Sequence, residues 1–394
     1  MQRAIIVGGS HAGLMTAVAL TDLGIEAEIF DRSAVPLEDR GAGLRVQPNL
    51  TDWLLSRGVD ILPLTTFSEV MRHLGPNNEI VFEEHQPGHS SSWSTLYRGL
   101  RTMAEDAPYN LGESCVGFEE SADGVRVKFA SGREEVADLV VFCDGIASTG
   151  RRILAPEATL DYAGYVGWRG FVPEANLTDE SLNIFDNATV FAFQPGTHVG
   201  FYFIPGPGGD VRRGHRFINY VWYRNLLAGP DFDDLIVRKD GTSSPISLHA
   251  GELQERFIDE SRVVAKGLPP AAAEVILKTE FPFIQPIYDV YVPRMAKGRA
   301  CLLGDAAFVA RPHAGGATSK AAADAKCLAE ELVAGPNVEA SLLRWEAKQL
   351  PLGRALVDKA KAIGTTYQGD AQWVAGDPKL RLGLPEQPNA REIK

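Results

Sequence analysis

A glycine-rich turn near the start of the chain constrains the fold more than any other feature. The stretch IIVGGSHAGLMTAVALTDLGIEAEIFDR (residues 5–32) contains an apolar run, the turn, a helical segment that ends at Gly24, and a second apolar run. The pattern predicts a strand over 4–7, a helix over 14–23 and a strand over 25–30. A β-α-β unit with such a first turn is typical of a parallel sheet that binds a nucleotide.

The residues of the turn fit that use with one departure. Gly8 permits the sharp strand-to-helix turn, and Gly13 lets the helix pack closely on the sheet. The fingerprint G-x-G-x-x-G has its second glycine where this chain has Ser10, a small residue whose hydroxyl can donate to a phosphate oxygen. Asp31, at the end of the second strand, is placed to accept ribose hydroxyls. The alternative is a glycine-rich turn that holds no ligand.

Composition and charge exclude several classes of partner. The 394 residues carry a formal net charge of −12, which argues against nucleic acid or an anionic membrane as the main partner. No apolar run approaches the roughly 18 residues of a membrane span, and no signal-peptide pattern precedes the first strand. The cysteines lack C-x-x-C spacing, so we expect buried thiols in a reducing cytoplasm and assign no residue to a metal. These cysteines are Cys115, Cys143, Cys301 and Cys327.

Two later stretches carry further motifs. VVFCDGIASTGRR (140–152) is an apolar strand followed by Asp144, and GRACLLGDAAFVARPHAGG (298–316) is a strand that ends in Gly304-Asp305 before a proline-bearing loop. An aspartate at the carboxyl end of a buried strand lies where α/β sheets hold ligands. The three motifs, in this order and at these separations, closely resemble those of the group A flavoprotein aromatic hydroxylases.

The resemblance implies bound FAD, with Asp305 near the ribityl chain and residues 312–317 along the isoalloxazine ring. Further stretches, among them GAGLRVQP (41–48) and RPHAGGATSKAAADA (311–325), are most similar to the 2,6-dihydroxypyridine hydroxylase branch. This chain departs from the family at Trp93, where an arginine is usual, and at Phe308, where many relatives have histidine. The cofactor-binding residues that the resemblance implies are Gly8, Ser10, Ala12, Gly13, Asp31, Arg32, Arg45, Gln47, Val116, Asp144, Gly304, Asp305, Pro312, Gly315, Gly316 and Ala317.

The predicted fold class is α/β (α+β overall), a Rossmann-like FAD-binding domain with an inserted antiparallel-sheet substrate domain, as in para-hydroxybenzoate hydroxylase. Short aromatic strands such as HVGFYFIPG and HRFINYVWYR predict the inserted sheet, with one face buried. The predicted segments are 1–72, 101–160 and 286–335 for the FAD-binding domain, 73–100 and 161–285 for the substrate domain, and 336–394 for C-terminal helices and a tail.

Only one β-α-β fingerprint is present, so one dinucleotide is held and NADH or NADPH would visit transiently. Reduced flavin and O₂ give a C4a-hydroperoxide whose distal oxygen is electrophilic. An electron-rich aromatic ring attacks that oxygen, more readily when a ring hydroxyl is deprotonated. The site must therefore exclude water and supply a polar group that receives the substrate proton. The predicted function is hydroxylation of a small aromatic ring, most similar to a hydroxypyridine, by an enzyme that forms a homodimer.

The candidate catalytic residues are His313, Tyr202 and Arg45. His313 follows the flavin-edge proline and could polarise or deprotonate the substrate, Tyr202 lies on a central aromatic strand, and Arg45 could hold charge that develops on the flavin. An ordinary sheet or loop role is the alternative for each. Further candidates on the aromatic strands and in the first turn are His11, His198, Tyr220, Trp222 and Arg224.

Three alternative functions stay open at this point. A hydroxybenzoate or a carboxylated pyridine could be the substrate, with Arg216 or Arg224 binding its carboxylate. A flavin oxidase or dehydrogenase on the same fold would transfer hydride without inserting oxygen. A non-catalytic FAD-binding protein would keep the scaffold but would not need the aromatic middle sheet.

Overall fold

The glycine-rich turn forms the predicted β-α-β unit. In the computed structural model, which describes residues 1–38, 42–121, 124–369 and 374–385, β1 (Arg3–Val7) and β2 (Glu26–Asp31) pair in parallel and α1 (His11–Thr21) connects them. The helix begins earlier than predicted, because Ser10 is already its N-cap. The first residues of the GAG turn and the end of the predicted tail lie outside the described residues.

A six-stranded sheet extends this unit, in the order β16-β17-β10-β1-β2-β6. The pairs are parallel except for β16 with β17, which is antiparallel. The added strands are β6 (Tyr109–Leu111), β10 (Leu139–Phe142), β16 (Ala296–Lys297) and β17 (Ala300–Leu302). Because parallel strands share one carboxyl edge, the motifs after β1 and β10 and the motif after β17 lie together.

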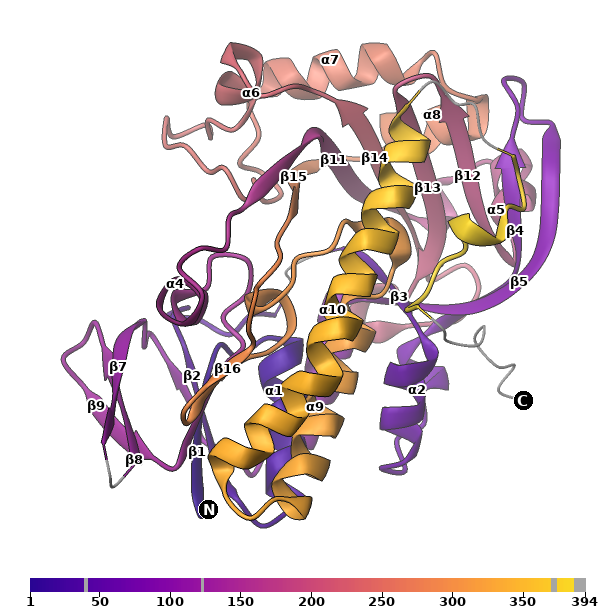
Figure 1. The fold of residues 1–394 in the computed structure, drawn as a ribbon. Coiled ribbons are helices and arrows are strands. Elements are labelled where there is room, and N and C mark those ends of the chain that lie inside the picture. The colour runs from indigo at the N-terminus through magenta and orange to yellow at the C-terminus, as the bar shows by residue number, and fades with distance from the viewer. Residues whose placement is uncertain (39–41, 122–123, 370–373, 386–394) are drawn as a thin grey trace.

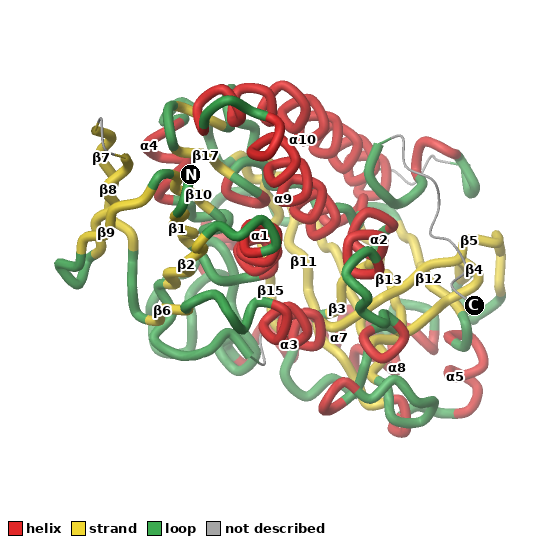
Figure 2. Tube along the Cα trace, turned by 90° about the horizontal axis from the view of Figure 1, so that it is seen from below, coloured by secondary structure: helices red, strands yellow, loops and turns green. Residues whose placement is uncertain are grey.

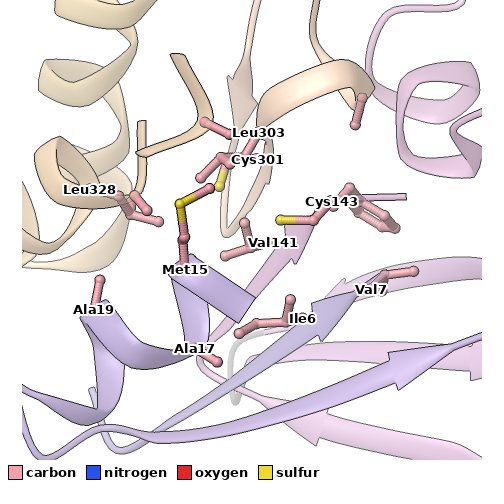
Figure 3. Packing of buried hydrophobic residues seen from close by; sticks show 14 of the residues in the cluster. Ile6, Val7, Met15, Ala17, Ala19, Val141, Cys143, Cys301, Leu303 and Leu328 are labelled. Carbon is pink, nitrogen blue, oxygen red and sulfur yellow. The ribbon is translucent and has the colours of Figure 1, made fainter. Parts of the chain in front are cut away.

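Helix α1 packs between this sheet and α9 (Ala317–Ala334). Met15 of α1 points toward Cys301 of β17, and Leu328 of α9 closes the same buried cluster (Figure 3). The long helix α10 (Val338–Gln368) lies beside α9 and continues to the second sheet (Figures 1 and 2). The α10 helix therefore bridges the two halves of the molecule. None of the described helices combines the length and apolarity that crossing a bilayer requires.

The second sheet has eight strands in the order β15-β11-β14-β13-β12-β4-β5-β3. One of its faces packs its apolar side chains against α5, α6, α7 and α8. The strands are β3 (Gly43–Val46), β4 (Thr66–Leu74), β5 (Ile80–Ser92), β11 (Asp161–Pro173), β12 (Ala188–Gln194), β13 (Thr197–Ile204), β14 (Phe217–Asn225) and β15 (Phe283–Asp289). The helices on it are α5 (Asp179–Phe185), α6 (Pro230–Leu235), α7 (Glu255–Ala265) and α8 (Pro270–Leu277).

The aromatic strands predicted from the sequence pair in antiparallel fashion, β12 with β13 and β13 with β14. One pair of this sheet is parallel, β4 with β12. The segment 1–72, predicted for the FAD-binding domain, contains β3 and most of β4, and both strands pair with β5 in the eight-stranded sheet. Pairing between distant segments is not specified by the local residue pattern.

A small antiparallel sheet is inserted in the chain between β6 and β10, in the order β7-β8-β9. These strands are β7 (Cys115–Ser121), β8 (Gly124–Phe129) and β9 (Glu134–Ala137), and the other short helices are α2 (Pro48–Leu55), α3 (Trp93–Met103) and α4 (Thr149–Leu154).

Candidate active site

A cavity of about 530 Å³ lies between the six-stranded and eight-stranded sheets. It is lined by the starts of α1 and α9, the loops that follow β10 and β17, and the free face of the eight-stranded sheet. Of the residues predicted from the sequence, its walls include Ser10, Ala12, Arg45, Tyr202, Gly304, Asp305, Pro312, His313, Gly315, Gly316 and Ala317.

Gly8 in the turn before α1 and Gly13 in the first turn of the helix leave no room for a side chain. Gly8 has a φ of +102°, and a Cβ there would lie 2.4 Å from the carbonyl oxygen of Cys143. A Cβ on Gly13 would lie 1.9 Å from the carbonyl oxygen of Gly8. Ser10 is the N-cap residue of α1, but neither its side chain nor that of another described residue makes a capping hydrogen bond there. The first N–H groups of α1 therefore remain available to an anionic ligand.

A second helix start faces the same cavity. Gly315 adopts a left-handed conformation with φ +61°, and Gly316 is the N-cap of α9, again without a side-chain cap from the described chain. Two helix N-termini with free N–H groups thus converge on one cavity, and both favour oxygen atoms that carry negative charge.

The three predicted aspartates have different surroundings. Asp305 lines the cavity. Burial raises the pKa of its carboxyl to about 6, and the positive charge of the nearby Arg151 opposes that rise. Asp144 accepts the N–H of Thr149 at 2.6 Å and so fixes the start of α4. Asp31 accepts the N–H of Gly9 at 2.7 Å, which holds the glycine-rich turn in place. Two of the three aspartates therefore shape the backbone of the site.

A buried ion pair on α9, which was not predicted from the sequence, supports the Gly304–Asp305 turn. Lys320 and Asp324 pair one helical turn apart, with exposed fractions of 2% and 0%. Asp324 also accepts the peptide N–H of Gly304 at 3.2 Å. The spacing of Lys320 and Asp324 could have predicted an ion pair, but not the contact with Gly304, which depends on the packing of α9.

The register between β13 and β14 decides which aromatic residues face the cavity. His198 pairs with Tyr223, and Tyr202 pairs with Asn219. The rings of these strands that line the cavity are those of His198, Tyr202 and Tyr223. The predicted candidates on β14 are wrong because they lie on the opposite face. Tyr220 and Trp222 belong to the core under α5 to α8, and Arg224 pairs with Glu260 at 2.9 Å.

His313 lies at the centre of a cluster of rings. Its Nε2 lies 2.7 Å from the hydroxyl of Tyr165, and its ring centre lies 4.3 Å from that of Tyr223 and 5.1 Å from that of His198. Burial holds the pKa of His313 well below its usual range and lowers the pKa of His198 to about 3. Both imidazoles are therefore neutral at physiological pH.

Two arginines that line the cavity have no acidic partner among the described residues. Nη1 of Arg45 donates to the hydroxyls of three residues, Ser68, Ser90 and Thr189, at 3.0–3.3 Å. Arg169, which the sequence analysis did not single out, donates to Gln285 Oε1 at 3.0 Å and to the carbonyl of Gly43 at 2.9 Å. Within the described ranges, no carboxylate lies within 4.0 Å of either guanidinium.

The arginine proposed to bind a substrate carboxylate, Arg216, is already paired. It donates to Glu174 at 2.6 Å and lies over the ring of Phe203. Together with the outward position of Arg224, this excludes both predicted carboxylate-binding residues from the cavity wall. Among the described residues, the positive charge in the cavity wall that lacks an acidic partner belongs to Arg45 and Arg169 instead.

The two departures from the family pattern have structural explanations. Trp93, at the usual arginine position, stacks on His11 with ring centres 4.7 Å apart, and its carbonyl oxygen lies 3.0 Å from His11 Nε2. Burial lowers the pKa of His11 to about 4, so this ring is a neutral packing element beside the turn. Phe308 is buried against Gly353 of α10, which leaves no space for another residue between them.

Some predicted cofactor residues do not line the cavity. Gln47 is buried, and its Nε2 lies close to the Gly315 turn, while Val116 is 58% exposed on β7. Arg32 directly follows β2. The predicted positions outside the cavity wall are Gly8, Gly13, Asp31, Arg32, Gln47, Val116 and Asp144.

A segment near the C-terminus closes one side of the cavity. Leu382 contributes to its wall, the N–H of Gly383 donates to the carbonyl of Ala314 at 2.7 Å, and Leu384 packs against Ala314 and Leu356. We call residues 381–385 the C-terminal strap. It fixes the loop that precedes α9 from the outside.

The arrangement of polar groups fits FAD. The free N–H groups at the two helix starts suit a pyrophosphate and the carbonyl edge of a flavin. The glycine turns at Gly8, Gly13 and Gly315 allow close approach of the backbone, and Asp305 offers a carboxylate to hydroxyl groups between them.

Comparison with known proteins identifies the family. A model of an FAD binding domain matches residues 1–201, and a model described as FAD binding domain-like matches residues 162–289. The 2,6-dihydroxypyridine 3-monooxygenase of Paenarthrobacter nicotinovorans is 32% identical over 386 residues, covering 98% of this chain and 96% of that protein. The 3-amino-4-hydroxybenzoate 2-monooxygenase of Streptomyces cremeus is 29% identical, covering 93% and 87%.

The structural comparison agrees with the sequence comparison. The structure of 2,6-dihydroxypyridine-3-hydroxylase from Arthrobacter nicotinovorans superposes with a TM-score of 0.93 at 30% identity, covering 100% of this chain and 99% of that chain. The salicylate hydroxylase substrate complex shares the fold, with a TM-score of 0.75 at 21% identity. The chain belongs to the FAD-dependent aromatic-ring monooxygenases, enzymes that use NAD(P)H and O₂.

Proposed function

We propose that this monooxygenase adds one hydroxyl group to a ring carbon of a hydroxypyridine. The observation that carries the proposal is the cluster of flat rings at the inner end of the cavity, where His198, Tyr223 and His313 lie within 5.1 Å of one another. Such walls suit a small planar ring that makes few hydrogen bonds. The names of the relatives above support a dihydroxypyridine in particular.

We also propose which residues would bind each part of FAD. The start of α1, with Ser10 and Ala12, would hold the pyrophosphate, and Asp305 would accept ribityl hydroxyls. The flavin ring would lie along residues 312–317, next to Arg45 and Gln47. The adenosine end would lie near Asp31, Arg32 and Val116. Bound FAD, once reduced by NADH or NADPH, supplies the oxygen-activating chemistry.

Hydrogen bonding fixes the orientation of His313. Arg311 donates to both carboxylate oxygens of Asp289, and its Nη1 donates to the Tyr165 hydroxyl at 3.3 Å. The Tyr165 hydroxyl can then donate its own proton to His313 Nε2, so the neutral ring carries its hydrogen on Nδ1. In this state His313 is a hydrogen-bond donor that polarises a ring oxygen of the substrate, rather than a base.

Apolar groups exclude water from the reacting end of the cavity. The wall includes Tyr367 of α10, Leu382 of the C-terminal strap, Phe191 and Ile287. Dry surroundings protect reactive oxygen species from hydrolysis and strengthen the hydrogen bonds to the substrate.

The substrate proposal is tested by measuring NADH oxidation and oxygen uptake with hydroxypyridines, pyridine carboxylates and hydroxybenzoates. We expect tight coupling of NADH use to product formation with a dihydroxypyridine. Coupling with a hydroxybenzoate and with no pyridine would contradict the proposed substrate and leave the monooxygenase assignment standing.

Two finer predictions concern the setting of the enzyme. The four cysteines are buried and free, which supports a reducing compartment, and we propose the cytoplasm. A homodimer remains a prediction, and sedimentation velocity of the holoenzyme tests it.

A further inference from the structure

A second cavity, of about 450 Å³, adjoins the cavity described above. Ala42, His249 and Phe283 line both cavities, so the two share a boundary. Helix α3, which lies beside α1 (Figure 2), runs along that boundary. Its residue Trp93 lines the first cavity, and its residue Arg98 lines the second. A ligand bound in the second cavity therefore lies next to the proposed flavin site.

The first cavity already has two assigned occupants, FAD and the aromatic ring. Its volume is about 530 Å³, and cavities of this size typically enclose one drug-sized ligand. The single β-α-β fingerprint, with Gly8 and Gly13, is also assigned to FAD. The ADP-ribose part of NADH or NADPH therefore needs a different site, close enough for the nicotinamide to contact the flavin.

The charge in the wall of the second cavity favours an anion. Arg98 is partly buried there and forms no ion pair with any described residue, and no aspartate or glutamate is among the described residues that line the cavity. Arg72 and Arg224, on strands of the eight-stranded sheet, instead pair with carboxylates at 2.7 and 2.9 Å. A guanidinium without such a partner suits phosphate, because its planar set of N–H groups matches two phosphate oxygens.

Aromatic side chains form another part of the wall. The rings of Phe171 and Phe217 lie with their centres 4.8 Å apart, and Phe283 lies at the boundary with the first cavity. Phe171 is 41% exposed, so its ring is accessible to a ligand. Such rings offer faces and edges to a planar group such as adenine. The wall thus combines a cation for phosphate with surfaces for a base.

A turn rich in glycine and proline completes the wall with residues 205–208, from the stretch PGPGG. The N–H of Gly206 donates to the carbonyl of Asp210 at 2.8 Å, and a Cβ on Gly206 would lie 1.8 Å from the carbonyl oxygen of His215. Gly208 has a φ of +68°, and a Cβ there would meet no atom within 4 Å. The turn is therefore fixed on its inner side and lets a ligand approach its backbone on the other.

We propose that the second cavity binds the ADP-ribose part of NADH, with Arg98 at the pyrophosphate and with Phe171 and Phe217 beside the adenine. The inference rests on the monooxygenase assignment and does not depend on which ring is hydroxylated. Among the described residues that line the cavity, Arg98 is the one with a permanent positive charge. The pyrophosphate takes that charge, which leaves no second cation for the 2′-phosphate of NADPH. The site therefore selects NADH over NADPH.

Binding of ADP-ribose tests the proposal, because this ligand cannot reduce the flavin. It is titrated into the FAD-loaded protein by isothermal titration calorimetry. We expect the parent to bind ADP-ribose and Arg98→Gln to bind it at least about tenfold more weakly. Arg98→Lys keeps the charge and should recover part of the affinity. 2′-Phospho-ADP-ribose should bind to the parent no more tightly than ADP-ribose.

Arg224 provides a matched control on β14. It pairs with Glu260 and lines neither cavity, so Arg224→Gln should leave the affinity for ADP-ribose unchanged. Each variant should keep the flavin absorbance of the parent, which reports folding and FAD binding. Equal affinities of Arg98→Gln and the parent, or no binding of ADP-ribose by the parent, would overturn the site. Tighter binding of the 2′-phosphorylated ligand would overturn the selection of NADH.

A variant that fills the cavity separates NADH binding from passage of the aromatic substrate. Ala250 lines the cavity at an exposed position, so Ala250→Trp should occupy it without disturbing the core. We expect a higher KM for NADH, an unchanged kcat at saturating NADH and an unchanged affinity for 2,6-dihydroxypyridine. Weaker binding of the pyridine with an unchanged KM for NADH would overturn the proposal and identify a substrate route. Failure of NADH to reduce the flavin of the parent would instead contradict the monooxygenase assignment.

Discussion

The carboxylate of Asp324 accepts the peptide N–H of Gly304 at 3.2 Å while it pairs with Lys320 inside α9. This links α9 to the turn that presents Asp305. Gly304 has a φ of +63°, a conformation that glycine adopts readily, and the contact with Asp324 fixes it there.

Removal of this carboxylate should weaken both folding and cofactor binding. Asp324→Ala leaves Lys320 buried without a partner, and breaking a buried pair costs about 3 kcal/mol. We expect lower thermal stability and lower FAD affinity by fluorescence titration. The double variant Lys320→Met/Asp324→Asn, which removes both charges, should recover most of the stability.

A control for that prediction lies on the same helix. Lys326 and Glu330 pair with the same spacing but are exposed, so Lys326→Met should change stability by less than about 0.5 kcal/mol. Equal effects of Lys326→Met and Asp324→Ala would contradict the role of the buried pair.

Asp305 should make FAD binding depend on pH. Its pKa is raised to about 6, so the carboxyl takes up a proton as the pH falls through that value. Ribityl hydroxyls donate to the ionised form, and FAD affinity should therefore be full above this pH and decline below it. Equilibrium dialysis of FAD between pH 5 and 8 measures the decline.

Two variants check the assignment of Asp305. Asp305→Asn should flatten the pH dependence of FAD binding, and Asp305→Ala should give folded protein with strongly reduced flavin content. A yield of Asp305→Ala protein as yellow as the parent would show that this motif does not hold the cofactor.

Ser10 should tolerate glycine. Within the described residues, the Ser10 side chain makes no capping hydrogen bond to α1. We therefore expect the backbone N–H groups at the start of α1 to bind the phosphate. Ser10→Gly should change FAD affinity by less than about tenfold, equivalent to roughly 1.4 kcal/mol. A larger loss would mean that the Ser10 hydroxyl itself binds the phosphate.

The C-terminal strap should control coupling between NADH oxidation and hydroxylation. Leu384 is 2% exposed, and Leu384→Ala opens a cavity next to Ala314, at a cost of about 2–4 kcal/mol. Water would then reach the reacting end, and more of the NADH consumed should appear as hydrogen peroxide. Val374→Ala, at a 75% exposed position of the same region, is the control and should keep the coupling of the parent.

Local sequence signals predicted the FAD-binding half well. The β-α-β unit and the turns with Gly8, Ser10 and Gly304 depend on neighbouring residues, and residue spacing reports such features directly. The helix over α10 was predicted among the C-terminal helices. The resemblance to a known family then supplied the cofactor.

The eight-stranded sheet was harder to predict because its geometry depends on distant pairings. Alternation placed Tyr220, Trp222 and Arg224 on one face of β14, but it could not say whether that face looks into the cavity. Packing of α5 to α8 decides that question and puts Tyr220 in the core. Arg169 was missed because its importance comes from the absence of an acidic neighbour in space, a property that the sequence does not display.

The most direct test of the whole account is one turnover experiment under ¹⁸O₂. The FAD-loaded enzyme, NADH and 2,6-dihydroxypyridine are mixed, and the product is analysed by mass spectrometry alongside a peroxide assay. The account predicts one ¹⁸O atom in the new ring hydroxyl for each NADH consumed, with little peroxide. A product without ¹⁸O, accompanied by stoichiometric peroxide, would contradict oxygen insertion and identify an oxidase on the same fold.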